Sequence, residues 1–387
     1  MTMKKIAILN YHPVQYFAPL YEFLTKKNLN IKVIYTSKQG IFNGLDRDFN
    51  QKFKWDIDLL KGYSYQFLDE NSILNKYYEI WKIIKNGKYD AIWVHGYSHS
   101  THIFSILTAK CYGIPVLIRG ETHLGLTKGK IRWYLHKKFL KIFFKNIDRL
   151  LAIGSKNYQY YVSLGIAQEK IFLTPYSVDN KRFSGEGLTD EQLKNIRKRY
   201  DINCSDIIVL FSSKFTKRKR AVDLLKAVKL LKEKNISVNY TVLMVGQGEE
   251  YNNLEDFVLK NKLENVKFLG FRNQAELPDI YAISDIFVLP SMNEPWGLVV
   301  NEAMCSASAI IITDEVGCSS DLVRDGQNGY IYSAGSVPEL TECLEKIILD
   351  KEKVCQFRRE SKKIINEWGY EQTSQGLINA LESLNGR

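Results

Sequence analysis

The chain has 387 residues, of which 45% are hydrophobic and 25% are charged, and it carries a formal net charge of +11. These ordinary globular proportions exclude a disordered chain, a collagen-like fibre and a small disulfide scaffold. At about 100–200 residues per domain, the length predicts two domains that each bury a core.

The N-terminus contains an apolar run of only four residues, from Ile6 to Leu9. A secretory signal needs about 7–15 apolar residues and a spanning helix about 18, so this run predicts a β-strand. The six cysteines are far apart and include no CxxC pair. That usage is typical of free thiols in a cytoplasmic protein and argues against structural zinc or a disulfide framework.

Short apolar, β-branched runs alternate with longer helical stretches, which predicts parallel sheets with crossover helices. In the first half, the predicted strands are Lys5–Leu9, Ile31–Tyr35, Ala91–Val94, Val116–Arg119 and Arg149–Ile153. In the second half, they are Ile207–Ser212, Thr241–Val245, Val266–Leu269, Ile286–Leu289, Ala309–Thr313 and Gly329–Tyr332.

The polar stretch Ser184–Tyr200 interrupts this alternation and predicts an interdomain linker that runs into a helix. We therefore expect an α/β protein with two Rossmann-like, doubly wound domains facing a central cleft. The expected boundaries are an N-terminal domain over 1–183, a linker over 184–200 and a C-terminal domain over 201–365. A C-terminal helix over 366–387 is expected to pack back toward the N-terminal domain.

Two Asp-x-Asp motifs, Asp46-Arg47-Asp48 and Asp56-Ile57-Asp58, lie in the first half. In other transferases such motifs bind a metal and a nucleotide sugar. Neither motif here clearly follows a buried strand, and carboxylate pairs occur by chance in many sequences. We therefore expect no metal site.

The positive charge is concentrated in residues 1–183, which hold 28 Lys and Arg against 13 Asp and Glu. Its focus is the stretch 128–145, with seven basic residues and no acidic one. A helix there would fit either an anionic membrane surface or, as an ordinary amphipathic helix, a buried apolar side in the core. The apolar residues at helical spacing are Ile131, Leu135, Phe139, Ile142 and Phe143, and the membrane-contact candidates are Lys137, Lys138, Lys141 and Lys145.

The segment FVLPSMNEPWGLVVNEAM, at residues 287–304, predicts a strand, a loop and a helix in that order. In parallel sheets, ligands bind where strands end and helices begin. The free N–H groups of a helix that starts at Gly297 could form a cradle for a diphosphate. Glu294 in the loop and Glu302 two turns into the helix could hold sugar hydroxyls. From spacing alone, both could equally be solvated surface acids.

Residues 268–304 resemble the donor-binding region of retaining glycosyltransferase family 4, whose members have the GT-B fold and a Glu-x7-Glu motif that Glu294 and Glu302 match. VGCSSDLVRDGQNGYIY, at 316–332, continues the similarity. FSSKFTKRKRAVDLL resembles the family's basic motif, and VGQGEE its glycine-rich turn. The similarity covers about residues 207–332. It departs where the family usually has Gly and Pro after the motif helix, since this chain has Cys305-Ser306-Ala307-Ser308-Ala309.

The resemblance implies a role for each matching residue. Lys214 and Lys219 would grip the diphosphate, and cations placed where charge develops are among the largest catalytic terms. Glu302 would hold the ribose hydroxyls, and Glu294 the transferred sugar near its 3-hydroxyl. The other donor-binding positions are Gly246, Gly248, Gly270, Phe271, Arg272, Gly297 and Leu298; the loop 270–272 would border the base, and the N–H groups of residues 297 and 298 would contact phosphate.

In the first half, HPVQY, KWDIDLLKGY and LIRGETH resemble N-terminal segments of one branch of the family. His12, His95 and His123 lie at or just after predicted strand ends, although a lone histidine is more often structural than catalytic. Many members have a histidine after the strand that begins at Pro115, where this chain has Glu121. The candidates for positioning an acceptor are His12, Arg119, Glu121 and His123.

These features predict a cytoplasmic glycosyltransferase, peripheral at the inner face of the membrane. It would move a sugar from a nucleotide-diphosphate donor to a hydroxyl of a glycan or lipid-linked acceptor, with retention, in surface polysaccharide biosynthesis. No residue is an obvious covalent nucleophile, so front-face departure and attack are expected. The resemblance implies no metal or other cofactor.

The alternatives are a nucleotide-sugar epimerase or phosphorylase of the same fold, or a basic membrane- or nucleic-acid-binding protein without catalysis. A phosphorylase would need a further phosphate site, and none is apparent. A non-catalytic binding protein leaves the two glutamates and the helix start unexplained. The sequence contains no recognisable nucleic-acid motif, so no nucleic-acid partner is expected.

Overall fold

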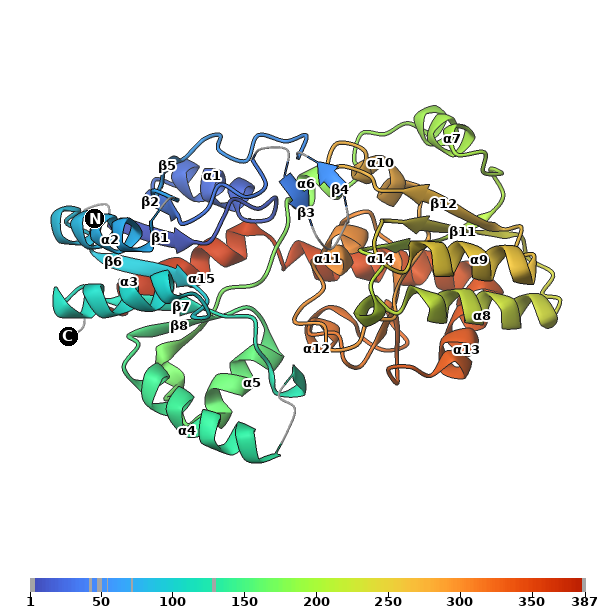
Figure 1. The fold of residues 1–387 in the computed structure, drawn as a ribbon. Coiled ribbons are helices and arrows are strands. Elements are labelled where there is room, and N and C mark those ends of the chain that lie inside the picture. Colours follow the sequence, from blue (N-terminus) through green and yellow to red (C-terminus); the bar gives the residue numbers. More distant parts are fainter. Residues whose placement is uncertain are drawn as a thin grey trace. The chain divides into compact units, whose positions relative to one another are not determined.

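The computed structural model describes residues 4–41, 44–46, 51–53, 55–70, 72–126 and 130–384. The chain divides into two compact units. The first contains the described residues of Met1–Gly44, Phe53–Ser177 and Tyr370–Arg387, and the second those of Leu45–Lys52 and Val178–Gly369. Each unit contains one parallel sheet between helices (Figure 1), which confirms the predicted α/β architecture.

The first sheet has the strand order β5-β2-β1-β6-β7-β8-β9, and its neighbouring strands are parallel. The order reverses between β1 and β6, so the chain leaves those two strands in opposite directions, which marks a topological switch point. The strands are β1 Lys5–Asn10, β2 Asn30–Tyr35, β5 Ser64–Phe67, β6 Ala91–His95, β7 Val116–Arg119, β8 Arg149–Ala152 and β9 Ile171–Leu173.

Helices cover both faces of this sheet because its strands are apolar on both sides. On one face, Ala7 and Leu9 of β1 pack in a core with Ile80, Leu140 and Phe144. That face is covered by α2 Ile73–Asn86, α3 Ser100–Cys111, α4 Lys130–Lys145 and α5 Ser155–Ser163 (Figure 1). The other face is covered by α1 Ala18–Lys26 and α15 Tyr370–Glu382.

The second sheet has the order β12-β11-β10-β13-β14-β15, again with parallel neighbours. Its switch point lies between β10 and β13, so the loops that follow these two strands begin side by side. The strands are β10 Ile207–Ser212, β11 Tyr240–Val245, β12 Val266–Gly270, β13 Ile286–Leu289, β14 Ala309–Thr313 and β15 Gly329–Tyr332.

One face of the second sheet packs against α8 Ala221–Glu233, α9 Tyr251–Asn261 and α13 Val337–Ile348. The remaining helices of this unit are α6 Asn180–Phe183, α7 Asp190–Arg199, α10 Leu277–Ala282, α11 Leu298–Cys305, α12 Ser319–Leu322 and α14 Lys351–Asn366. Short elements complete the description: β3 Gly44–Asp46, β4 Gln51–Phe53, and single 3-10 turns at Leu124–Leu126, Gln168–Lys170 and Lys217–Lys219. None of the helices described is both long and apolar enough to cross a bilayer.

All the predicted strands are present, each within one residue of its expected ends, and the two compact units divide a few residues away from the expected domain boundaries. The first unit ends at Ser177, six residues before 183, and it resumes at Tyr370 instead of 366. Helix α6 packs against α11 of the second unit, where the Ser306 hydroxyl donates to the Phe183 carbonyl over 2.5 Å.

The predicted linker, 184–200, is also part of the second unit. Its helix α7 is capped by Thr189, and Arg197 donates to the Asp206 carbonyl over 2.9 Å. A second contact joins Arg199 to Asp279 of α10 over 3.1 Å. The polar sequence suggested a linker because α7 buries only Ile196. The helix is instead attached to the second unit by its charged side chains.

Candidate active site

The two glutamates of the Glu-x7-Glu motif are buried in the second unit. Glu294, in the loop after β13, is 7% exposed, and Glu302, within α11, is 1% exposed. Lys219 Nζ donates to Glu294 Oε2 over 2.6 Å, and the Tyr281 hydroxyl donates to Glu302 Oε2 over 2.7 Å. The alternative that both are solvated acids is therefore wrong, because each is buried and held by a partner.

Two cations converge on Glu294 from the 3-10 turn after β10. Besides Lys219, Arg218 Nη1 donates to the same Oε2 over 2.8 Å. Lys219 is 8% exposed, and Arg218 lies nearer to solvent. The cluster therefore carries more positive than negative charge, which suits an anionic ligand.

The half-buried Lys214 lies in the same β10–α8 loop. Burial lowers the pKa of Lys219, and the positive charges of Arg218 and Lys214 lower it further, while Glu294 opposes the shift. The structure thus places Lys219 in contact with Glu294 at the switch point, and Lys214 lies in the same loop, near enough to Lys219 to lower its pKa. Sequence reasoning missed Arg218 because it is one of several cations in the run KFTKRKR.

Backbone hydrogen bonds join the loop between Glu294 and α11 to the segment that follows β14. Glu294 N donates to the Glu315 carbonyl over 3.2 Å, and Gly317 N donates to the Glu294 carbonyl over 2.9 Å. At the helix start, Gly297 has φ +100°, a left-handed conformation that favours glycine. Because Leu298 is the first residue of α11, the free N–H groups of the first turn begin directly after the buried carboxylate.

The same loop carries Trp296, which is 3% exposed. Its indole Nε1 donates to Asn301 Oδ1 over 2.9 Å. The ring lies 5.5 Å from that of Trp368, with an interplanar angle of 30°. The two indoles thus connect the loop beside α11 to the last residues of the second unit.

The glycine-rich turn after β11 packs directly on the basic loop. Gly246 has φ +142°, and a Cβ there would lie 2.0 Å from the Ser213 carbonyl oxygen. Its N–H donates to the Gly270 carbonyl over 2.9 Å, which joins the ends of β11 and β12. At Gly248, in the same turn, a Cβ would lie 2.5 Å from the Phe215 carbonyl oxygen. The predicted glycines therefore allow the donor-side loops to approach one another.

Arg272, predicted to border the base, is held by groups of its own unit. Its Nε donates to the Leu269 carbonyl over 3.0 Å, and Nη1 to Glu276 Oε1 over 2.8 Å. The guanidinium also lies 5.7 Å from the Tyr200 ring. These contacts fix the shape of the loop that contains Gly270 and Phe271.

In the first unit, two of the predicted histidines have a hydrogen-bond partner: His95, which is half-buried, and His123, which is buried. His95 ends β6, and its Nε2 lies 3.0 Å from the Tyr21 hydroxyl. Burial and the nearby Arg119 lower the pKa of His95 well below its usual range, so the ring is neutral. His123 is 3% exposed, and its Nδ1 accepts from Gly125 N over 3.2 Å. His12, just after β1, is half-buried.

The other acceptor-side candidates lie at the end of β7. Arg119 is its last residue and is 3% exposed, whereas Glu121 is exposed. Glu121 Oε1 accepts a hydrogen bond of 2.8 Å from the hydroxyl of Tyr176, a residue that sequence reasoning missed. No motif marked Tyr176, because it follows the short strand β9, which the sequence analysis did not predict.

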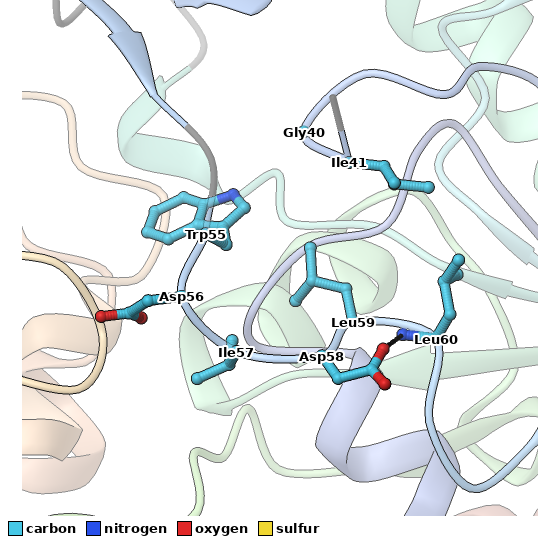
Figure 2. Close-up of a pocket in the computed structure, with 8 residues that line it drawn as sticks. All are labelled: Gly40, Ile41, Trp55, Asp56, Ile57, Asp58, Leu59 and Leu60. Atoms are coloured by element: carbon cyan, nitrogen blue, oxygen red, sulfur yellow. Dashed lines mark hydrogen bonds between the residues drawn. The ribbon is translucent and has the colours of Figure 1, made fainter. Parts of the chain in front are cut away.

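The second Asp-x-Asp motif lines a pocket of about 610 Å³ in the first unit (Figure 2). Asp58 accepts from Leu60 N over 3.0 Å, and the Asp56 and Asp58 carboxylates point in different directions from the loop. No group of three potential metal ligands occurs within the described residues. The first motif, at 46–48, lies mostly outside them. The other lining residues are Gly40, Ile41, Trp55, Ile57, Leu59 and Leu60.

On helix α4, part of the predicted apolar side is exposed. Among its described side chains Leu140 and Phe144 are buried, whereas Phe139 is 62% and Ile142 is 65% exposed. The alternative in which the core covers Phe139 and Ile142 is therefore wrong, because the helix turns a neighbouring stripe toward the sheet. Lys137 is half-buried, Lys138, Lys141 and Lys145 are exposed, and the predicted residues Ile131 and Leu135 lie outside the described side chains.

Two Rossmann-like sheets, the second with cations and a buried Glu-x7-Glu pair at its switch point, define a glycosyltransferase of the GT-B class. Residues 193–364 match the family described as "Glycosyl transferases group 1". This match, which lies within the second unit, is to the group that the sequence resemblance predicted, family 4 of the glycosyltransferases.

Curated relatives extend the similarity beyond the second unit. The UDP-Gal:alpha-D-GlcNAc-diphosphoundecaprenol alpha-1,3-galactosyltransferase of Escherichia coli is 25% identical over 298 residues, which are 74% of this chain and 73% of that protein. The N,N'-diacetylbacillosaminyl-diphospho-undecaprenol alpha-1,3-N-acetylgalactosaminyltransferase of Campylobacter jejuni is 24% identical over 334 residues, 83% of this chain and 85% of that protein.

Among solved structures, Anabaena HepE in complex with UDP has a TM-score of 0.77 at 16% identity. The superposition covers 99% of this chain and 100% of that one. At this identity the likeness establishes the GT-B fold.

Proposed function

We propose that this glycosyltransferase transfers a sugar from a UDP-sugar to a hydroxyl of a lipid-linked glycan, with retention of configuration, in surface polysaccharide biosynthesis. The observation that carries the donor half of the proposal is the cluster in which Arg218 and Lys219 share the Glu294 carboxylate beside the start of α11. The names of two relatives include a diphosphoundecaprenol acceptor, and one includes UDP-Gal as donor.

Each donor-side group has a chemical task in this proposal. Lys214 and Lys219, with the N–H groups that begin at Leu298, offset the charge that develops on the leaving diphosphate. Glu294 accepts hydrogen bonds from the transferred sugar. Glu302 accepts them from the ribose, in an orientation that the Tyr281 hydroxyl fixes. No covalent nucleophile is required: the acceptor hydroxyl attacks the anomeric carbon on the face that the diphosphate leaves, and a phosphate oxygen of the departing nucleotide takes the hydroxyl proton.

A panel of nucleotides tests the donor. Ligand that binds only the native state raises its melting temperature, so UDP and UDP-sugars are expected to raise it more than ADP, CDP or GDP at equal concentration. Glu302→Gln is the matched control and should reduce the shift. Transfer from the best donor to a short-chain lipid diphosphate sugar is then followed by release of UDP. Equal shifts for all nucleotides, or no transfer, would contradict the proposal.

We further propose that the first unit docks on an anionic membrane at the cytoplasmic face through the outer surfaces of α2, α3 and α4. These helices carry Leu74, Tyr78 and Leu107 at 73%, 60% and 59% exposure, in addition to Phe139 and Ile142. Large exposed apolar side chains beside lysines are typical of interfacial helices. The exposed lysines of these three helices are Lys82, Lys85, Lys110, Lys138, Lys141 and Lys145.

Each lysine near an anionic surface contributes on the order of 1 kcal/mol of attraction. Changing the four α4 lysines to Gln should therefore abolish most binding to vesicles that contain anionic lipid, while transfer to a water-soluble acceptor survives. Co-sedimentation at two salt concentrations is the measurement. A matched control variant, in which four lysines of the second unit are changed to Gln, should bind the vesicles as the wild-type chain does. Vesicle binding that is unchanged by the α4 substitutions would contradict the proposal. The two sets are Lys137, Lys138, Lys141 and Lys145, and Lys226, Lys229, Lys232 and Lys260.

A further inference from the structure

Arg119 is a buried cation without a contacting carboxylate among the described residues. Neither Nε nor Nη1 has a hydrogen-bond partner there, and Nη2 is 3.4 Å from the Pro175 carbonyl oxygen. Its guanidinium instead lies 4.7 Å from the Tyr176 ring and 5.7 Å from the Phe17 ring. Such an arrangement is costly for stability alone, because an apolar side chain would fill the same space without burying a charge.

Tyr176 is the residue that this cation holds in place. Its ring is stacked with Phe17 at 5.8 Å and 10°, and its N–H donates to the Ile153 carbonyl over 3.1 Å. The adjoining Pro175 carbonyl accepts from Thr373 of α15 over 2.7 Å. Tyr176 is thus held by its backbone, by one aromatic face and by a cation, so the direction of its hydroxyl is fixed.

That direction is toward Glu121, whose Oε1 accepts the Tyr176 hydrogen bond over 2.8 Å. Burial and the negative charge of Glu121 raise the pKa of Tyr176 well above its usual range, so the phenol keeps the proton that it donates. Glu121 is exposed and follows β7 by two residues, on the carboxyl edge where parallel sheets bind ligands.

We infer that Tyr176 and Arg119 are positioning residues that act through Glu121: they fix its carboxylate so that it accepts a hydrogen bond from a hydroxyl of the acceptor sugar. This inference rests on the proposed function and deepens its acceptor half. A carboxylate on a loop loses rotamer freedom when it binds, and a hydrogen bond from a rigid phenol removes part of that loss beforehand. Arg119 stacks its planar guanidinium on the phenol ring, which Lys would not do.

Steady-state kinetics of the full chain, with donor and acceptor varied separately, test the inference. Tyr176→Phe keeps the ring and removes only the donor hydroxyl. It should lower kcat/KM for the acceptor about tenfold, the effect of losing one hydrogen bond to a charged group. The KM for the donor and the hydrolysis of donor without acceptor should not change. In the Glu121→Ala background, which lacks the acceptor oxygen, Tyr176→Phe should cost less than about twofold, because the two residues act as one unit.

Two further variants separate positioning from folding. Tyr35→Phe removes another buried tyrosine hydroxyl of the same unit, bonded to Tyr63 over 2.7 Å, and should leave acceptor kinetics unchanged. Arg119→Met should leave the melting temperature unchanged or higher, while lowering kcat/KM for the acceptor several-fold. Arg119→Lys should fail to restore it.

The inference is overturned if Tyr176→Phe leaves acceptor kinetics unchanged, or if it costs as much in the Glu121→Ala background as in the wild-type chain. It is also overturned if Tyr35→Phe causes the same loss, since the effect would then be general loosening of the unit. A wild-type chain that binds a UDP-sugar but transfers it to no lipid-linked glycan would overturn the proposed function itself, and the role of Glu121 with it.

Discussion

At the carboxyl edge of the second sheet, the buried charges of the motif are matched by close partners, with Glu294 touching two cations and Glu302 a phenol. At the edge of the first sheet, Arg119 is buried among aromatic rings instead. The difference indicates two kinds of binding. The cluster around Glu294 has more positive than negative charge, which suits a diphosphate, whereas the first unit surrounds its cation with aromatic rings and presents a carboxylate, which suits neutral hydroxyls.

Among variants that disturb one of the two sites, the largest effect on activity is expected at Lys219. Lys219→Ala should lower kcat by about 10²-fold or more, because one well-placed charge-stabilising donor commonly contributes that much. Lys214→Ala should cause a reduction of similar size. Measured kcat values decide the matter, and full activity in either variant would remove that lysine from the donor site. Activity in excess chelator should be undiminished; strict metal dependence would favour the Asp-x-Asp motifs instead.

Replacing Glu302 and replacing Glu294 should affect different kinetic constants. Glu302→Ala should raise the donor KM about tenfold, because a hydrogen bond to the ribose that is equally strong in the ground and transition states contributes to affinity and not to turnover. Glu294→Ala should mainly lower kcat, because it removes a group beside the reacting sugar and leaves two cations unpaired. Separate determination of KM and kcat shows the split, and equal, near-normal kinetics in both variants would refute the assignment.

A pH profile should reveal the buried lysine. Burial lowers the pKa of Lys219 from its ordinary value, so kcat/KM, which reports the free enzyme, should fall as pH rises through that lowered pKa. In the same window the unfolded chain binds more protons, so folding stability rises with pH and unfolding does not explain the decline. Lys219→Arg should move the alkaline limb to higher pH, because a guanidinium stays protonated. An unmoved limb would assign the titration to another group.

The smallest effect concerns the loop after α11, where the chain departs from its family. Ala307 has φ +61°, a left-handed conformation that is unfavourable for alanine. Ala307→Gly should therefore raise the free energy of unfolding by about 0.5–1 kcal/mol, after allowance for the greater freedom of glycine in the unfolded chain. Urea denaturation measures the change. Kinetic constants should stay at wild-type values, because Ala307 belongs to neither cluster of buried charge.

The sequence was sufficient for the strands of both sheets that have strong apolar runs, and for the donor-side residues whose spacing matches a family motif. The sequence analysis did not predict β9, because this strand has only three residues, or β5, because its sequence SYQF is half polar. Both are edge strands, which need less apolar sequence than central ones.

Contacts between segments that are far apart along the chain could not be predicted from the sequence alone. Arg218 is not one of the matched positions of the basic motif, Tyr176 belongs to no motif, and their partners lie 76 and 55 residues away along the chain. Helical spacing in 128–145 permitted two apolar stripes, and only packing against the sheet decided that Leu140 and Phe144 are buried. The donor motif was readable because its residues are close in sequence, whereas the acceptor side depends on tertiary structure.

The stacked indoles of Trp296 and Trp368 have an optical consequence. Two indoles 5.5 Å apart couple their electronic transitions, so this pair should give a circular dichroism signal that an isolated tryptophan lacks. One of them, Trp296, follows Glu294 by two residues in the loop that precedes α11. Donor binding could thus be observed in unlabelled enzyme, without turnover, as a change in that signal, and Trp368→Phe would silence it while leaving the loop sequence intact.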